Sequence, residues 1–515
     1  MPDPRPNILL ITSDQQHYDT LGCTNPRIRT PRLDRLAAEG TRFDRAYCPN
    51  PTCTPTRASI ITGMYPSQHG AWSLGTKLFE DVPTVGHLLG GAGYATALIG
   101  KAHFQPLATR PGMESIECQP LMRQLDFWRK WHGPWYGFEH IETARNHTCE
   151  SHAGQHYAVW MEDNGLANWR DYFVDWPHRP DDVARRMAQR HWGLPEKYHY
   201  TRWTAERTVA HIRQSLGQGR PFFTWASFMD PHPPYVLSEP WASMYDPDDM
   251  LPGRLHPGEH DRNPPHFART QQPRPDWSPW NREPWIHGFM SHLQDEQELR
   301  RDMAIYYGMI SFMDQQIGVI LDELEAAGAA ENTLVVFTTD HGHFLGQHGL
   351  IAKGPFHYED MIRIPFIVRR PGRTPAGRVS RDIQSLVDLA PTFLAAAGVE
   401  APGVMTGLDQ SASWSGGGPV RRWAIVENHH TPTTVHLRTY VEDRYKITVY
   451  RDCQAGGGHG EADYGELFDL QADPGELHNL WHDPAAQPIK TALLHRFLQA
   501  TIQSEPMRMP RIWGA

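Results

Sequence analysis

Short apolar runs and amphipathic stretches alternate along this chain. The runs at residues 7–13, 94–100, 221–228, 333–340 and 365–368 are typical of buried strands. Between them, helices are predicted over residues 30–40, 83–93, 201–216, 294–327 and 385–397. Strands that alternate with helices predict an α/β protein, with a mostly parallel sheet sandwiched between layers of helices.

Three segments interrupt this alternation. Residues 105–200 and 236–292 are rich in Pro, Trp and His, and we expect them to be long insertions over the sheet. Residues 411–418 are rich in Ser and Gly, which predicts a flexible linker. We therefore divide the chain into a large α/β domain at 1–410 and a smaller α+β subdomain at 411–515. That subdomain is predicted to hold antiparallel strands near 423–428, 436–441 and 445–450, and a helix over 485–503.

Composition narrows the class of protein. The 515 residues are 39% hydrophobic and 21% charged, enough to bury a sizeable core. A net charge of −10 argues against a nucleic-acid binder.

No apolar run approaches the roughly 20 residues of a membrane span, and the first residues lack the features of a secretory signal. We therefore expect a soluble, cytoplasmic protein. Six cysteines without a CxxC pair are too few for a disulfide scaffold.

Polar residues stand where four of the predicted strands end, which is where ligands gather in an open parallel sheet. These ends are Asp14-Gln15, Lys101-Ala-His103, Asp230-Pro-His232 and Asp340-His341. Asp14, Asp340 and His341 suit a divalent cation, because carboxylate oxygens favour calcium, magnesium or manganese and an imidazole favours manganese or zinc. The alternative is that these groups only cap helices or form a structural Asp–His hydrogen bond.

The most specific motif is Cys53-Thr-Pro-Thr-Arg57, followed by Thr62-Gly63. It resembles the C-x-P-x-R signature of the sulfatase family. Other motifs of that family follow in the same order: G-K-x-H at 100–103, Pro231-His232, D-H-G at 340–342, K-G-x-x-x-Y-E-x-x-x-R-x-P at 353–365, and D-L-A-P-T at 388–392. The resemblance spans residues 7–480 and implies an alkaline-phosphatase-like fold.

The resemblance also implies a chemistry. Cys53 would be oxidised to formylglycine by a formylglycine-generating enzyme, and the hydrated aldehyde would attack the sulfur of a sulfate ester. One divalent metal ion is implied, calcium by family and otherwise manganese or zinc, with Asp14, Gln15, Cys53, Asp340 and His341 as its ligands. The implied catalytic residues are Cys53, Arg57, Lys101, His103 (the base that releases sulfate), His232 and Lys353 (the partners of the leaving oxygen).

Two departures from the family pattern keep a second activity open. Gln15 and His341 replace an acidic residue and an asparagine, as in the related phosphonate monoester and phosphodiester hydrolases. Two features argue against membership of that branch. The chain has both Lys101 and His103, and it has Ser73-Leu-Gly75 where that branch carries an asparagine. We therefore predict hydrolysis of aryl or similar alkyl sulfates, with phosphonate hydrolysis as the alternative. A non-catalytic binding protein, or a phosphatase with an unmodified nucleophile, is disfavoured because the motif residues are all present.

Other features concern the substrate, the assembly and the remaining aromatic residues. We expect a small-molecule substrate and a homo-oligomer. Thirteen of the 18 tryptophans lie between Trp128 and Trp285, which suggests a pocket wall or an interface and an apolar leaving group. His343, His348 and His357 are interpreted as supporting or structural residues.

Overall fold

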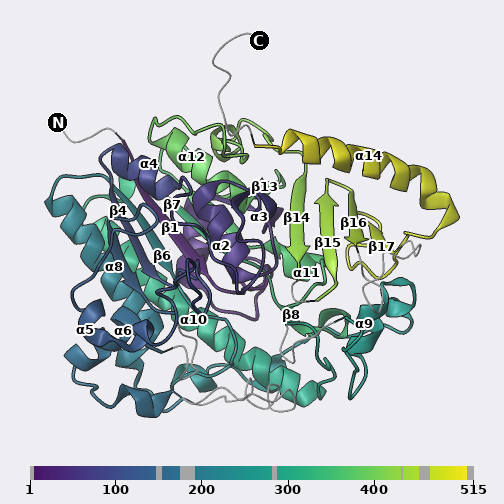
Figure 1. Ribbon diagram of the computed structural model, residues 1–515, viewed down its shortest axis with the longest axis horizontal. Helices are drawn as coiled ribbons and strands as arrows, with labels where there is room; N and C mark the ends of the chain where they lie inside the picture. Colours follow the sequence, from purple (N-terminus) through teal and green to yellow (C-terminus); the bar gives the residue numbers. More distant parts are fainter. Residues whose placement is uncertain are drawn as a thin grey trace, which may run out of the picture.

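The computed structural model describes residues 5–145, 153–173, 192–280, 287–430, 433–451 and 464–506. Its centre is an eight-stranded sheet in the order β12-β2-β11-β7-β1-β6-β4-β5 (Figure 1). The strands β7, β1, β6, β4 and β5 run parallel, whereas β11 is antiparallel to both β7 and β2. The predicted mostly parallel α/β sheet is confirmed. The strands are β1 (Asn7–Ser13), β2 (Thr41–Phe43), β4 (Ala95–Gly100), β5 (His140–Thr143), β6 (Phe222–Ser227), β7 (Thr333–Thr339), β11 (Phe366–Arg369) and β12 (Arg378–Ser380).

Both faces of the sheet are buried, which is why its strands are apolar throughout. Ile8 and Leu10 of β1 pack into the core under helices α2, α4 and α12, while Leu9 and Ile11 pack into the core under α1, α8 and α10. These helices are α1 (Pro31–Glu39), α2 (Cys53–Thr62), α4 (Val85–Gly91), α8 (Tyr200–Gly217), α10 (Glu296–Ala326) and α12 (Leu389–Ala396).

Local sequence signals set several helix ends. Pro31 occupies the first turn of α1, and Gly40 ends it. The long helix α10 follows its N-cap residue Asp295, whose carboxylate accepts hydrogen bonds from the backbone of Gln297 and Glu298. The predicted helix over 385–397 starts later than expected, because Gln384–Ser385 pair as strand β13 with β3 (Ala46–Tyr47). Within the described parts of the chain, no helix is both long and apolar enough to cross a membrane.

The tryptophans of the first insertion do not form a pocket wall. Trp169 and Trp192 are at most 6% exposed and pack with Tyr157, Phe173 and Trp203 of α8 in a separate hydrophobic core. That core gathers α6 (Gln155–Asp163) and the start of α8. The predicted pocket wall is therefore wrong for these residues, whose role is to stabilise the insertion. Strand β5, which also lies in this insertion, extends the main sheet at its edge.

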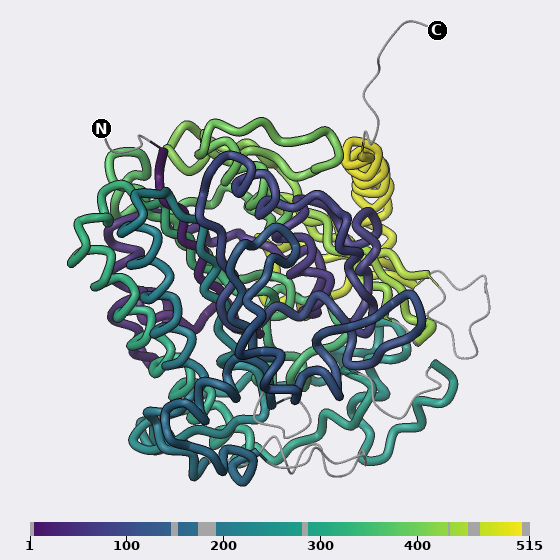
Figure 2. Tube along the Cα trace, turned by 60° about the vertical axis from the view of Figure 1, so that its left-hand side comes forward, coloured from purple at the N-terminus to yellow at the C-terminus, as the bar shows by residue number. Residues whose placement is uncertain are grey.

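The C-terminal part is an antiparallel sheet, as predicted, but it has a fourth strand beyond the three expected, in the order β14-β15-β16-β17. Its strands are β14 (Ala424–His429), β15 (His436–Val441), β16 (Tyr445–Arg451) and β17 (Gly465–Asp469). The last helix, α14 (Gln487–Gln503), packs Leu493 and Phe497 on this sheet and lies at the edge of the molecule in both Figure 1 and Figure 2.

The segment before this sheet is not a flexible linker, so that prediction is wrong. Ser411–Trp414 form the short helix α13, in which Ser413 is fully buried and Trp414 is 5% exposed. The indole nitrogen of Trp414 donates to the side-chain oxygen of Gln384 at 2.9 Å. Packing therefore fixes this segment despite its Ser and Gly content.

Candidate active site

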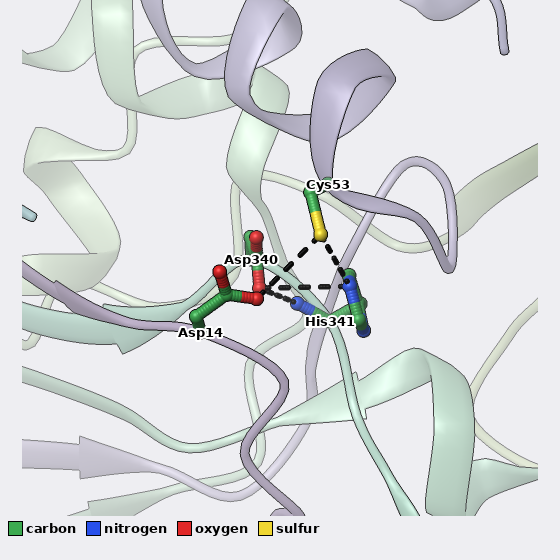
Figure 3. A group of neighbouring side chains, drawn as sticks. All are labelled: Asp14, Cys53, Asp340 and His341. Carbon is green, nitrogen blue, oxygen red and sulfur yellow. Dashed lines mark hydrogen bonds and ion pairs between the residues drawn. The ribbon is translucent and has the colours of Figure 1, made fainter. Parts of the chain in front are cut away.

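The carboxyl ends of β1 and β7 meet the N-terminus of α2 at one buried point (Figure 3). Asp14 follows β1, Asp340 and His341 follow β7, and Cys53 is the first residue of α2. One ligand atom from each of these four side chains lies within 4.8 Å of the other three. The strand ends singled out in the sequence therefore do gather at one place, and the nucleophile motif joins them there.

The thiol of Cys53 lies between acidic and basic groups. Its sulfur is 3.5 Å from Asp14 Oδ1 and 3.3 Å from His341 Nε2. It is also 3.3 Å from Lys353 Nζ and 3.7 Å from Lys101 Nζ, and Lys101 in turn pairs with Asp14. Burial, together with the Asp14 carboxylate, raises the pKa of the thiol, although the two lysines oppose this shift. An unmodified Cys53 is therefore mostly protonated at neutral pH and is a weak nucleophile.

Arg57 binds both carboxylates from one helical turn beyond Cys53. The guanidinium is fully buried, with Nε 2.8 Å from Asp340 Oδ2 and Nη2 3.5 Å from Asp14 Oδ2. Its Nη1 donates to the carbonyl oxygen of Lys101 at 2.8 Å and to the hydroxyl of Ser227 at 2.7 Å. Arg57 thus neutralises two buried acids and ties α2 to the ends of β4 and β6.

The donor set fits a divalent cation. Nδ1 of His341 donates to the carbonyl oxygen of Gly342 at 3.0 Å, which leaves the lone pair of Nε2 on the side of Cys53. Burial lowers the pKa of His341 to about 4, so the ring is neutral at pH 7 and can act as a ligand. Gln15 adds a second indication, because its Oε1 is buried and has no hydrogen-bond partner among the described residues. Two carboxylates, an imidazole and an amide oxygen are suitable ligands for such an ion.

Lys353 and His232 form a pair beside Cys53. Lys353 Nζ is 3.0 Å from Nε2 of His232, whose Nδ1 donates to the carbonyl oxygen of Pro233 at 2.6 Å. Burial and then the neighbouring Lys353 and Lys101 hold the pKa of His232 well below its usual value. The imidazole is therefore neutral, and its Nε2 accepts a hydrogen bond from Lys353.

Lys101 and His103 follow β4. Lys101 is fully buried and forms an ion pair with Asp14. The backbone of His103 has a left-handed conformation, with φ of 58°, and its amide donates to Oε1 of Glu117 at 2.8 Å. The amide of Gln105 donates to the other oxygen of Glu117 at 2.7 Å. Glu117, which the sequence analysis missed, therefore fixes the loop that carries His103.

Glu117 has its own counter-ion, since Nη1 of Arg145 lies 3.3 Å from its carboxylate. Both residues come from the Pro- and Trp-rich insertion and both are buried. No spacing or motif in that insertion distinguishes them from surface charges. Only the folded chain shows that they support the site.

The three histidines interpreted as supporting residues occupy such positions. His348 bridges Glu259 and Asp360 and stacks on Tyr358, with ring centroids 3.5 Å apart. His357 forms a 2.7 Å hydrogen bond with the hydroxyl of Thr439 in β15, which links the Lys353 loop to the C-terminal sheet. His343 contacts Gln15.

Comparisons with known proteins agree with the motifs. The sequence model of the Sulfatase family matches residues 6–399, and that of the N-sulphoglucosamine sulphohydrolase C-terminal region matches residues 346–503. An arylsulfatase of Clostridium perfringens is 29% identical, over 92% of this chain and 90% of its own length. The multifunctional alkaline phosphatase superfamily protein PehA of Trinickia caryophylli is 27% identical, over 93% of this chain and 92% of its own.

Among solved structures, the phosphonate monoester hydrolase of Agrobacterium radiobacter superposes with a TM-score of 0.76 at 25% identity, covering 97% of this chain and 96% of its own. The family match covers most of the chain, and its C-x-P-x-R cysteine lies among the metal-ligand atoms. The chain therefore belongs to the sulfatase family of sulfuric ester hydrolases.

Proposed function

We propose that this protein hydrolyses aryl or similar alkyl sulfate esters through a formylglycine made from Cys53. The observation that carries the proposal is that the Cys53 side chain belongs to a cluster of possible metal-ligand atoms and also lies beside the ammonium groups of Lys101 and Lys353. A nucleophile at this position is next to groups that can hold the negative oxygens of a sulfate. The high pKa of the unmodified thiol supports a modified residue as the nucleophile.

A divalent cation such as calcium, manganese or zinc would be held by Asp14, Gln15, Asp340 and His341. Its positive charge would favour an ionised hydroxyl on residue 53 and polarise the sulfate. Lys101 and Lys353 would hold the sulfate oxygens as charge builds on them. One hydroxyl of the hydrated aldehyde attacks sulfur, and the S–O bond to the alcohol breaks. The departing oxygen takes a proton from Lys353, which His232 orients.

The second half of the reaction needs a base. His103 is our candidate, and it would remove the proton of the second hydroxyl on residue 53. The C=O bond then re-forms, the C–O bond to sulfate breaks, and sulfate leaves with the electron pair. Arg57 would keep Asp14 and Asp340 in place through both halves.

Hydrolysis of phosphonate monoesters or phosphodiesters is the second candidate function. Two observations favour it: His341 belongs to the group of ligand atoms beside Gln15, whose backbone amide bonds Asp340, and the fold superposes on the Agrobacterium phosphonate monoester hydrolase. We rank sulfate esters first, because Lys101 and His103 are both present. Small-molecule esters are the expected substrates in either case, and a formylglycine-generating enzyme would be the partner during maturation.

Two measurements test the proposal. Mass spectrometry of the peptide containing Cys53 should show conversion of its thiol to an aldehyde, and Cys53→Ala should abolish turnover. Cys48→Ala is the matched control, because Cys48 is equally buried but its thiol donates to the carbonyl oxygen of Met361 and is not part of the ligand cluster. Full turnover by protein whose Cys53 is wholly unmodified would contradict the mechanism. Comparing kcat/KM for an aryl sulfate and a phosphonate monoester, on enzyme of known metal content, ranks the two functions.

A further inference from the structure

A chain of hydrogen bonds leads away from the amide of Gln15. Its Nε2 is 2.8 Å from Nδ1 of His343, and Nε2 of His343 is 2.6 Å from the hydroxyl of Tyr235. The ring of His343 is fully buried and stacks on Tyr306, with centroids 4.8 Å apart and planes 15° apart. Stacking and two hydrogen bonds leave this imidazole a single orientation.

The backbone of Gln15 is fixed by separate contacts. Its amide donates to Asp340 Oδ1 at 2.9 Å, and its carbonyl oxygen accepts from the hydroxyl of Tyr306 at 2.9 Å. Its φ of 61° is left-handed, a conformation that a residue other than glycine adopts only when its surroundings enforce it. With the backbone held, rotation of the side-chain amide decides which of its two ends contacts His343 and which is left without a protein partner.

Hydrogen-bond donors and acceptors determine that rotation. Because the amide nitrogen donates to Nδ1, the single proton of a neutral His343 must be on Nε2, from which it is donated to the oxygen of Tyr235. The amide oxygen of Gln15 is then the end without a protein partner among the described residues, and it is buried. In the opposite tautomer Nδ1 would donate to the amide oxygen, and the NH₂ group would take its place and repel a cation.

We propose that His343, held by Tyr235 and stacked on Tyr306, is a positioning residue that turns the amide oxygen of Gln15 toward the divalent cation and thereby sets metal affinity. The inference rests on the cation of the proposed function. It goes further, because it assigns the tautomer of His343 and gives a histidine outside the ligand group control over metal binding.

The test measures metal affinity and not turnover. Ca²⁺ and Mn²⁺ are titrated calorimetrically into metal-stripped wild type, His343→Ala, Gln15→Leu and the double variant. Loss of a residue that orients a ligand should weaken binding about 10- to 100-fold. Since His343 acts through Gln15, the double variant should bind no more weakly than Gln15→Leu. His343→Asn, whose side-chain oxygen can replace Nδ1 as acceptor, should recover part of the affinity.

His211→Ala is the matched control, because His211 is also buried but bonds the hydroxyl of Thr224 in β6. It should leave both dissociation constants unchanged. Unchanged affinity in His343→Ala, or additive losses in the double variant, would overturn the inference. Neither result would contradict the cation of the proposed function. If the wild type itself binds neither ion, the cation of the proposed function fails and the inference fails with it. Should His343→Ala not fold, His343→Asn and Tyr235→Phe are compared with Gln15→Leu in the same way.

Discussion

Arg57→Ala tests how much of the structure depends on the charge balance of the site. The substitution removes a fully buried guanidinium whose partners, Asp14 and Asp340, are themselves at most 1% exposed. Lys101 would remain as a neighbouring cation for Asp14, but Asp340 would lose the ion pair that its Oδ2 makes. The hydrogen bonds to the Lys101 carbonyl and to Ser227 would also be lost.

The expected cost follows from burial. Breaking a buried ion pair by removing one partner typically costs about 3–5 kcal/mol, because the other charge is left in a poorly solvated place. Arg35 provides the comparison, since it also lies on a helix and also approaches several carboxylates, with Nη2 3.0 Å from Glu325. Arg35 is 35% exposed and Glu325 48%, so water screens the pair and Arg35→Ala should cost about 0–1 kcal/mol.

Urea unfolding in the presence of a chelator, followed by tryptophan fluorescence, measures both free energies of unfolding. Arg57→Lys should lose most of the same stability, because one ammonium cannot reach the four partners of the guanidinium. The reasoning is refuted if Arg57→Ala and Arg35→Ala lower the free energy of unfolding by amounts within about 1 kcal/mol of each other. It is also refuted if Arg57→Lys is as stable as wild type.

Two further predictions concern residues that support the site. Glu117→Ala removes the acceptor of the backbone amides of His103 and Gln105. It should lower kcat/KM for an aryl sulfate about 10- to 100-fold, because small displacements of catalytic groups have effects of this size. A kcat/KM within twofold of wild type would show that these two hydrogen bonds are not needed. His348 is buried, which opposes its charge, but Asp360 and Glu259 outweigh burial and raise its pKa from 6.5 to about 9. It should therefore add about 3 kcal/mol of stability that is fully present below pH 6.5 and is lost as pH rises through about 9. His348→Gln should remove this slope in unfolding measured from pH 6 to 9.5, and an unchanged slope would contradict the assignment.

The sheet and the ligand cluster were predictable because both follow from local sequence. Apolar runs mark strands buried on two faces, and the carboxyl ends of parallel strands bring Asp14 and Asp340 together whatever the loops do. The orientation of Gln15 was not predictable. It depends on Tyr235, Tyr306 and His343, which are more than 200 residues away in sequence and reach it only in the folded chain.

The segment at 411–418 shows why composition alone can mislead. Its serines and glycines predict flexibility, because ordering each residue costs about 1–2 kcal/mol of conformational entropy. One aromatic residue changes the balance: Trp414 packs near Phe366 and Phe393, with ring centroids 6.1 and 6.4 Å away, and its indole nitrogen has an acceptor. Removing a buried tryptophan of this kind typically costs about 3–5 kcal/mol, comparable with the entropy of ordering the four residues of α13. The hydroxyl of Ser413 adds a 3.0 Å hydrogen bond to Asp382. The same reasoning applies to the insertion at 105–200, where the tryptophans predicted a pocket wall or an interface but buried aromatic side chains form a core.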